Sequence, residues 1–556
     1  MREALVLIAG IIFLPGVVGA QNPTPARASA APEKDVCSVS GQVVRAASNA
    51  PLRKAYIHVR NADEGPHAKG YGTRTDDSGR FSITGIPSGR YSLRVERVGY
   101  VDQFYGESGS QGHEAILALA PGENAHDLLF RMVPWSVISG RITNENGEPV
   151  IRASVVAMRS RVEDGERQLD VHESALTNDL GEYRIWSLGK GRYYIRADRD
   201  HSTSFPSRGA LSRGTGYAPV FYPGTSDVAQ AVALDVRAGQ EVPSVDFILV
   251  PARASRVSGH VTSAIPGYKM TWANVMLAPA SRSGFQGFGQ EAVVDTAKGS
   301  FQIDGVVAGS YDVLLWATLG GTHRSARQRI EVRESDLSDV DLAIEKGAEI
   351  LGRISGVQKE AARVEIVLKP AEGGFGERPR GDVKADGTFV IGEVSEGKYG
   401  VDVAHAGPDV YLKSVRIGAQ DVLLSGINVG PTGIKGTLEV ELGTAGGVVE
   451  GAVTDPDGLP VAGATTVLIP DGKLRTRYSF YRDTTTDQHG KFIFRGVRPG
   501  EYKVFSWQEV ESGDWEEAEF IKPVEEKGVK VTVEENGRRA VEVKVISGDA
   551  TAKTNP

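Results

Sequence analysis

Thr-Asp-Gln-His-Gly-Lys-Phe-Ile-Phe-Arg-Gly-Val-Arg-Pro-Gly-Glu-Tyr, residues 486–502, contains the pattern that decides the fold. A glycine is followed two residues later by an aromatic residue, eight residues after that by a second glycine, and two residues further on by a tyrosine. The same spacing occurs five times without a gap: Gly79/Phe81/Gly89/Tyr91, Gly181/Tyr183/Gly191/Tyr193, Gly299/Phe301/Gly309/Tyr311, Gly387/Phe389/Gly397/Tyr399 and Gly490/Phe492/Gly500/Tyr502. The copies lie 88 to 118 residues apart, which is too far for a solenoid and enough for one small domain each. The sequence therefore predicts five domains in a row.

Each copy of the pattern predicts two strands joined by a tight turn. In the fifth copy Phe492 and Phe494 fall on one face of a strand, and Tyr502 and Val504 fall on one face of the next. This period of two is typical of an antiparallel sheet with one buried and one solvated face. Two such sheets packed face to face form a β-sandwich.

A second pattern opens every unit, in which apolar residues stand two positions before and two positions after a glycine. It is found at residues 39–43, 138–142, 257–261, 350–354 and 449–453. Turn residues follow it at Asn146-Gly147-Glu148-Pro149 and Asp457-Gly458-Leu459-Pro460, as expected for hairpins. No helical periodicity is sustained, so we expect an all-β protein with helix well below one third: a tandem array of about five immunoglobulin-like or transthyretin-like antiparallel β-sandwich domains.

The same patterns predict the domain boundaries. The expected segments are a signal peptide at 1–20, a flexible leader at 21–36, sandwiches at 37–133, 134–251, 252–346, 347–447 and 448–547, and a tail at 548–556. Short junctions that contain proline, such as Val133-Pro134-Trp135 and Val250-Pro251, predict a semi-rigid rod or arc.

The stretch from Thr486 to Tyr502 resembles the carboxypeptidase regulatory-like domain, a family of transthyretin-like and collagen-adhesin B-type sandwiches. The resemblance covers nearly all of residues 37 to 547 and is best in the first, second and fifth units. The third and fourth units lack a clear Asn/Asp-Gly-x-Pro hairpin after their first strand, so their boundaries are less well defined. The resemblance implies non-catalytic sandwiches found beside catalytic domains, in adhesins or ahead of outer-membrane barrels.

The N-terminal residues predict export. Arg2 precedes an apolar stretch from Ala4 to Val18, and Val18-Gly19-Ala20 has the small residues of a cleavage site. No later segment is apolar enough to span a membrane after the signal is removed. We expect a periplasmic, cell-surface or secreted protein. The mild net charge of −8 does not favour nucleic acid as a partner.

The residues needed for common catalytic chemistry are missing from the sequence. A zinc carboxypeptidase needs a histidine that is followed three residues later by a glutamate, and none of the ten histidines is followed in this way. No Gly-x-Ser-x-Gly elbow is present either, and Cys37, the one cysteine, has no histidine near it. The carboxylates at Asp76-Asp77 and Asp455-Pro456-Asp457 are too few for calcium and typical of turns. We therefore expect no enzyme activity, no cofactor and no metal.

Aromatic residues remain as candidates for ligand binding, because rings on loops stack on sugars or anchor protein partners. They are Tyr105, Tyr217, Phe221, Tyr222 and Trp515. Trp515 stands in residues 509–527, which contain eight acidic residues and two lysines, and is the best candidate for an exposed ring. The alternative is that the rings close the ends of sandwiches or fill domain junctions.

These observations give three functional hypotheses. The first is an exported non-catalytic protein that binds carbohydrate or other envelope or extracellular material, with a polysaccharide or an envelope protein as partner. The second is a structural spacer or assembly subunit with protein–protein contacts. The third is an enzyme whose site lies between domains and leaves no motif.

Overall fold

The computed structural model describes residues 36–63, 70–106, 115–199, 215–263, 265, 267, 269–280, 290–320, 322–356, 364–371 and 378–547. The predicted signal peptide, nearly all of the leader and the tail lie outside these residues. The described chain forms five pairs of sheets, called units one to five in chain order, so the predicted all-β fold of tandem sandwiches is confirmed. The predicted domain boundaries stay a proposal.

Unit one consists of a sheet in the order β4-β1-β8 and a sheet in the order β3-β2-β5-β6, in which β7 also pairs with β5. Its strands are β1 (Val36–Arg45), β2 (Tyr56–Asn61), β3 (Gly70–Arg74), β4 (Arg80–Pro87), β5 (Gly89–Glu96), β6 (Gln103–Phe104), β7 (Leu117–Leu119) and β8 (Asn124–Met132).

Unit two pairs the sheet β12-β9-β17, with β18 also on β9, with the sheet β11-β10-β13-β15, with β16 also on β13. Its elements are β9 (Ser136–Asn144), β10 (Ala153–Glu163), β11 (Glu166–Leu176), β12 (Glu182–Leu188), β13 (Gly191–Arg199), β15 (Val220–Phe221), the 3-10 helix η2 (Val228–Gln230), β16 (Leu234–Val236), β17 (Glu241–Val242) and β18 (Phe247–Leu249). The strands β10 and β11 form a long hairpin.

Unit three pairs the sheet β14-β19-β22, with β25 also on β19, with the sheet β21-β20-β23-β24. Its strands are β14 (Thr215–Tyr217), β19 (Pro251–Ser263), β20 (Met270–Pro279), β21 (Gln290–Val293), β22 (Ser300–Val307), β23 (Gly309–Leu319), β24 (Thr322–Val332) and β25 (Leu337–Ile344). The strand β14 precedes β15 of unit two in the chain but pairs with β19 of unit three.

Unit four pairs the sheet β29-β26-β34-β31-β32 with the sheet β28-β27-β30-β33. Its strands are β26 (Ala348–Ser355), β27 (Glu365–Pro370), β28 (Arg380–Asp382), β29 (Thr388–Val394), β30 (Gly397–Ala404), β31 (Tyr411–Ile417), β32 (Gln420–Asp421), β33 (Ile427–Val429) and β34 (Leu438–Gly443).

Unit five pairs the sheet β38-β35-β41 with the sheet β37-β36-β39-β40. Its strands are β35 (Gly447–Thr454), β36 (Thr465–Pro470), β37 (Arg482–Thr485), β38 (Lys491–Val497), β39 (Gly500–Trp507), β40 (Val529–Val533) and β41 (Arg538–Lys544). Its short helices are η3 (Gly472–Thr476), η4 (Tyr478–Phe480), η5 (Asp514–Glu516), α1 (Ala518–Ile521) and η6 (Lys522–Lys527). Among the described residues α1 is the one α-helix, as the low predicted helix content requires.

The repeated glycines have two structural reasons. The first glycine of the spacing pattern lies in a turn at positive φ, as at Gly79 (φ +72°), where other residues are strained. The glycine of the opening strand lies beside the last strand of its unit. At Gly41 a Cβ atom would stand 2.0 Å from the carbonyl oxygen of Leu128 on β8, so a side chain does not fit. These first and last strands run parallel in every unit, a pairing not predicted from the sequence.

The tyrosine of the pattern makes the same hydrogen bond in all five units. Its hydroxyl donates to the carbonyl of the residue four positions earlier, which ties the strand to the turn before it. The pairs are Tyr91 to Pro87 at 2.9 Å, Tyr193 to Gly189 at 3.1 Å, Tyr311 to Val307 at 3.0 Å, Tyr399 to Ser395 at 3.0 Å and Tyr502 to Arg498 at 2.8 Å. Burying the ring therefore leaves no unpaired hydroxyl.

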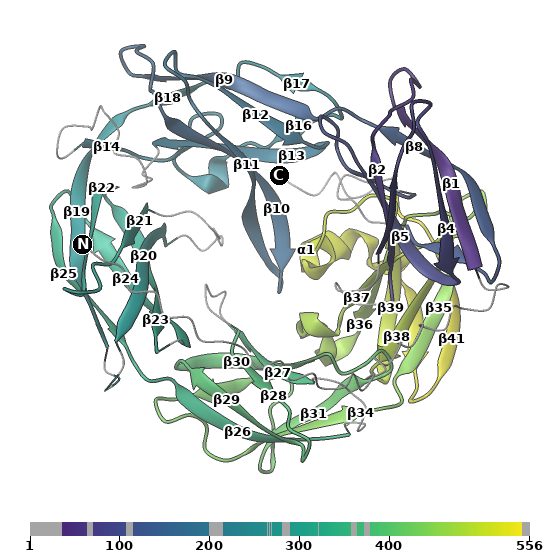
Figure 1. Cartoon of the computed structure of the whole chain (residues 1–556). Helices are drawn as coiled ribbons and strands as arrows, with labels where there is room; N and C mark the ends of the chain where they lie inside the picture. The colour runs from purple at the N-terminus through teal and green to yellow at the C-terminus, as the bar shows by residue number, and fades with distance from the viewer. Residues whose placement is uncertain are drawn as a thin grey trace, which may run out of the picture.

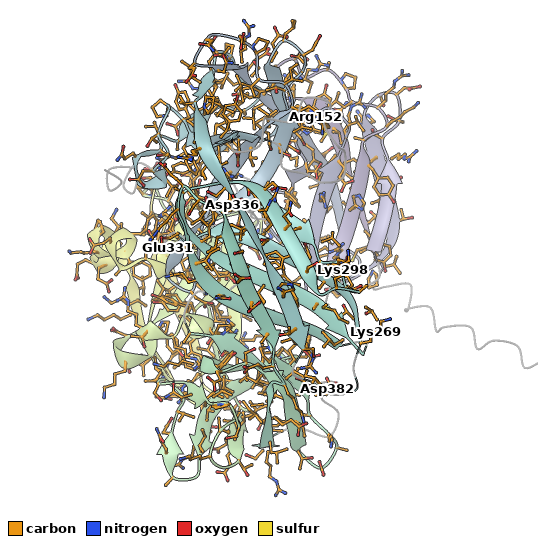
Figure 2. All side chains as sticks on the ribbon, turned by 90° about the vertical axis from the view of Figure 1, so that its left-hand side faces the viewer. Arg152, Lys269, Lys298, Glu331, Asp336 and Asp382 are labelled. Carbon is orange, nitrogen blue, oxygen red and sulfur yellow. The ribbon has the colours of Figure 1, made fainter. Side chains whose placement is uncertain are left out.

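The five units are arranged in a ring (Figure 1), so of the predicted rod or arc the straight rod is wrong. In each unit the sheet that contains β2, β10, β20, β27 or β36 lies toward the centre, and the sheet that contains β1, β9, β19, β26 or β35 lies outside. Figure 2 shows the ring on edge, with unit one toward one side and unit five toward the other. The array is therefore one turn of a shallow spiral.

Contacts between the first and last units close this turn. The side-chain amide of Gln488, in unit five, donates to the carbonyl oxygen of Ala118 at 3.0 Å and accepts from its backbone N–H at 3.2 Å. Close packing accompanies these bonds, since a Cβ atom on Gly463 would lie 2.2 Å from the carbonyl oxygen of Gly106. The short junctions between the units turn the array consistently in one direction (Figure 1).

Candidate functional site

Two cavities lie on the wall of unit four. The larger, with a volume of about 1110 Å³, lies between units three and four, and the smaller, of about 360 Å³, lies between units four and five. Arg378 and Arg380 line both cavities, so the two adjoin at β28. Ligand sites in proteins typically have volumes of about 300–1,000 Å³. The pair is therefore the candidate site.

The site is basic, although the chain as a whole has 63 Lys and Arg residues against 71 Asp and Glu residues. The cationic residues of the larger cavity are Arg324, Arg327, Lys346, Arg378, Arg380 and Lys398. The smaller cavity adds Lys369, Arg482 and Arg498. The acidic residues of the two linings are Glu345, Glu393, Glu396 and Asp402. With nine cationic and four acidic residues the linings carry a net positive charge, whereas the whole chain has a net charge of −8.

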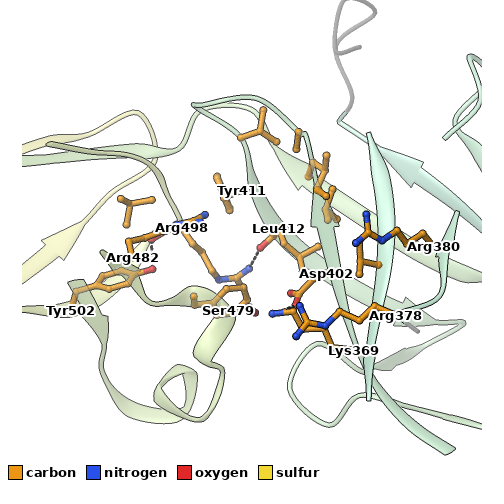
Figure 3. A pocket seen from close by; sticks show the side chains of 18 residues that line it. Lys369, Arg378, Arg380, Asp402, Tyr411, Leu412, Ser479, Arg482, Arg498 and Tyr502 are labelled. Carbon is orange, nitrogen blue, oxygen red and sulfur yellow. Dashed lines mark hydrogen bonds and ion pairs between the residues drawn. The ribbon is translucent and has the colours of Figure 1, made fainter. Parts of the chain in front are cut away.

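Strand alternation explains why unit four presents these charges. On β27, Ile366 and Leu368 point into the core of the sandwich. Lys369 follows Leu368 directly and therefore lies on the opposite face of the strand. On β30, Tyr399 and Val401 are core residues, and Lys398 and Asp402 fall on the other face. Figure 3 shows Lys369, Arg378, Arg380 and Asp402 on one side of the smaller cavity, with Arg482, Arg498 and Tyr502 on the other.

A loop of unit five closes one end of unit four. Arg477 is 9% exposed and donates from Nη2 to Asp402 Oδ1 at 2.7 Å and to the carbonyl oxygen of Val401. Phe480, from the same loop, packs into the core cluster of unit four, and the Arg477 guanidinium lies 5.3 Å from its ring centroid. Burial acts to raise the pKa of Asp402, but Arg477 and Lys369 hold it below its ordinary value. The carboxylate is therefore charged and its partner fixed.

The hairpin of β10 and β11 reaches the site from unit two. Glu163, at its tip, accepts a hydrogen bond from Arg378 at 2.6 Å and pairs with Arg161 at 2.8 Å. Burial acts to raise the pKa of Glu163, but the hydrogen bond from Arg378 and the charges around it leave that pKa lowered. Arg378, which lines both cavities, is thus held in place by Glu163 of unit two, 215 residues away in the sequence.

The same hairpin docks on residues 508–528 of unit five. Arg167 donates to both carboxylate oxygens of Glu517, at 2.7 and 3.0 Å, and lies 3.5 Å from Asp514. The backbone N–H of Gly165 donates to Glu516 at 2.9 Å. A Cβ atom on Gly513 would lie 1.9 Å from the carbonyl oxygen of Val162, so the two segments are in direct contact.

Three carboxyl groups at this contact have raised pKa values, and burial is the main cause in each. They are Glu511, Asp514 and Glu516. Burial raises the pKa of Asp514 to about 7, while the charge of Arg167 opposes the rise and the charges of Glu511 and Glu517 add to it. The stability of the docking contact therefore depends on pH. Burying these carboxylates is unfavourable while they are charged, and this cost falls as they take up protons.

The structure places the predicted aromatic residues away from these cavities. Tyr217 is 7% exposed and Phe221 is 6% exposed, so neither ring offers a free face for a ligand. Tyr222 is half-buried against Phe247, with ring centroids 6.5 Å apart. Tyr105 is half-buried, 6.5 Å from the ring of Phe130, next to the contact between units one and five. Binding roles for these residues stay a prediction that the geometry does not support.

The prediction of an exposed ring at Trp515 is wrong, because its exposed fraction is 5%. Residues 508–528 cover the inward face of β36 and β39, and their apolar side chains pack on it. The cluster contains Val467, Ile469, Phe505, Trp507, Val510, Trp515, Ile521, Val524 and Ile546. The apolar residues spaced among the acids of residues 509–527 were the signal for this amphipathic segment.

The other candidate residues have structural roles. Asp76 accepts hydrogen bonds from the N–H groups of Ser78 and Arg80 at 2.9 and 2.8 Å, and Asp455 accepts from Leu459 at 2.8 Å, as turn carboxylates do. Cys37 is buried in β1, where its thiol donates to the carbonyl oxygen of Ala120 at 3.1 Å. Within the described residues no three His, Cys, Asp or Glu side chains are grouped as they would be around a metal ion.

The comparison with known protein families identifies two segments of the chain. The model of the carboxypeptidase regulatory-like domain matches residues 38–115 and 448–515. These segments lie in units one and five, so the predicted resemblance is confirmed there, and the family is a regulatory-like rather than a catalytic one. No curated protein matches the chain in sequence.

Several solved structures are similar to parts of the array. GBS52, the minor pilin of Streptococcus agalactiae, is 11% identical with a TM-score of 0.23, over 39% of this chain and 95% of its own. The shaft pilin SpaA of Lactobacillus rhamnosus GG is 10% identical with a TM-score of 0.19, over 39% of this chain and 97% of its own. The Bacillus anthracis TIE protein is 12% identical with a TM-score of 0.14, over 73% of each chain.

Among the described residues, no helix combines the length and the hydrophobicity that are needed to span a bilayer.

Proposed function

We propose that this chain is an exported, non-catalytic binding protein that holds extracellular or envelope material, with carbohydrate as the ligand class, on the inner wall of its ring. The observation that carries the proposal is the pair of adjoining cavities on unit four. The larger cavity, with a volume of about 1110 Å³, is big enough for several sugar rings.

The composition of the larger cavity supports a carbohydrate. Trp316 is half-buried in its lining, next to Leu314 and Met276, and an indole face is a surface on which sugar C–H groups stack. Charged and hydroxyl side chains around it, including Ser325 and Ser395, supply hydrogen bonds to sugar hydroxyls. The ring geometry weakens the spacer hypothesis, because a closed turn does not provide reach.

A glycan array with the mature full-length chain tests the proposal. We expect binding that Trp316→Ala reduces at least several-fold, because stacking on a tryptophan is lost. Trp272→Ala is the matched control, since Trp272 lies on the same sheet, is 46% exposed and does not line either cavity. Silence across the array, together with stoichiometric capture of one envelope protein by cross-linking, would replace carbohydrate binding with the assembly hypothesis.

Export is tested separately. Expression with the native N-terminus should yield a protein in the periplasm or medium whose sequence begins at Gln21, after cleavage at Ala20. Retention of Met1 in the cytoplasmic fraction would contradict export without affecting the binding experiment.

A further inference from the structure

The charges on the inner wall of unit four indicate a more specific class of ligand than carbohydrate in general. Both cavities are lined by an excess of arginine and lysine, and Arg378 and Arg380 belong to both linings. A ligand that follows the wall from unit three to unit five would pass cationic groups along its whole length. A neutral ligand would not use these groups, whereas an anionic one would.

Several of these cations are available to a ligand. Within the described part of the chain, Lys346, Lys398 and Arg482 have exposed side chains and no carboxylate at ion-pair distance. Arg380 is exposed and has a long contact of 3.5 Å with Glu365. Cations that outnumber the carboxylates around them repel one another, and a ligand that brings negative charge reduces this repulsion.

The remaining cations are held in position by partners in the protein. Asp312 holds Arg327 at 2.8 Å, and Glu163 holds Arg378 at 2.6 Å. Arg498 donates to the carbonyl oxygen of Leu412 at 2.6 Å, as Figure 3 shows. Fixed guanidinium groups lose little entropy when they bind a carboxylate or sulfate, and their planar donors fit two oxygens at once.

We propose that these two adjoining cavities bind an acidic polysaccharide, a chain whose sugars bear carboxylate or sulfate groups. The inference rests on the proposed function and deepens it. Trp316 supplies the stacking face for a sugar ring, and the cations of units three, four and five supply the sites for its charged groups. A peptide rich in acidic residues would use the cations but gains less from a single stacking face, so the combination favours the polysaccharide.

The test is calorimetric titration of the mature full-length protein with polygalacturonate, with neutral dextran of similar length, and with poly-glutamate. We expect binding to polygalacturonate that weakens as salt is raised, because screening shortens the range of the attraction. The double variant Lys398→Glu/Arg482→Glu should lose about tenfold or more in affinity, because both charges are reversed at exposed positions of the two cavities.

The matched control is Lys269→Glu/Lys298→Glu, which makes the same kind of charge change at positions that line neither cavity (Figure 2). It should bind polygalacturonate as the wild type does. Equal loss in both double variants would show a long-range charge effect and overturn the proposed site. Binding of dextran but not polygalacturonate would overturn this inference and leave carbohydrate binding intact. Binding of poly-glutamate alone would overturn both, as would no binding to any polymer.

Discussion

Arg167 and Glu517 form a two-pronged ion pair across the centre of the ring, at 2.7 and 3.0 Å, although 350 residues separate them in the chain. The pair joins the hairpin of unit two to the segment of unit five that covers β36 and β39. It connects two units that are not neighbours along the chain, so it holds the array closed rather than holding one sandwich together.

Replacing Arg167 by alanine should therefore open the array without unfolding its units. We expect the loss of about 1–3 kcal/mol of docking free energy, because a paired and partly buried charge on Glu517 loses its partner. Small-angle X-ray scattering should show a larger radius of gyration, and limited proteolysis should cut the β10–β11 hairpin faster. Arg161→Ala is the control, since its pairs with Glu163 and Asp170 lie within one hairpin. An unchanged scattering curve for Arg167→Ala would contradict this role.

The docking contact should become weaker as the pH rises. The pKa of Asp514 is about 7 in the folded protein and 3.8 as its ordinary value, so between these limits the folded state holds a proton that the unfolded chain has released. Asp514 therefore contributes its full stabilisation of the folded state below about pH 3.8, and this contribution is lost as the pH rises toward 7. Arg159, Arg167 and Arg192 face the acids and reduce the effect.

Thermal unfolding between about pH 5 and pH 8 measures this dependence. Asp514→Asn should have a smaller fall in Tm over the range than the wild type and be more stable near pH 8 by about 2 kcal/mol, because the amide has no charge to bury. Glu519→Gln is the control, because Glu519 is exposed in the same segment. A steeper fall for Asp514→Asn than for the wild type would show that the sign is wrong.

Arg477→Ala should destabilise the junction of units four and five strongly. The variant leaves Asp402 largely buried without its 2.7 Å partner, and we expect a cost of about 3–5 kcal/mol. Differential scanning calorimetry should show an earlier transition, and Lys473→Ala, at an exposed position of the same loop, should not. Equal Tm values for the two variants would remove the proposed importance of this contact.

Trp515→Ala should behave as a core truncation. Because the ring is 5% exposed among apolar side chains, its loss should cost about 3–5 kcal/mol in urea denaturation. Trp186→Ala, at a position that is 50% exposed, should cost much less. A neutral effect of Trp515→Ala would support the original prediction of an exposed ring.

The fold of the single unit could be predicted from the sequence, because its determinants are local. The spacing of Gly490, Phe492, Gly500 and Tyr502 reports one turn and two half-buried strands, and the structure has both. The parallel pairing of first and last strands was not predicted, since it joins residues such as Gly41 and Leu128 that no short pattern links.

The ring and its site could not be predicted in the same way. The site combines Arg327, Lys398 and Arg482 from three units, and these charges have no spacing that distinguishes them from ordinary surface residues. Trp515 was misassigned for a different reason. The acids around Trp515 indicate a solvated segment, but apolar residues recur among those acids and pack together in the structure.

The parallel pairing of the first and last strands in each sandwich also limits how the array can grow. A chain that enters and leaves a sandwich in the same direction comes in at one pole and goes out at the opposite pole, so each added module continues the path of the one before it. Because five modules already complete a circuit, a sixth would have to stack above the first. Duplication of a module would therefore lengthen a coil and leave its diameter unchanged.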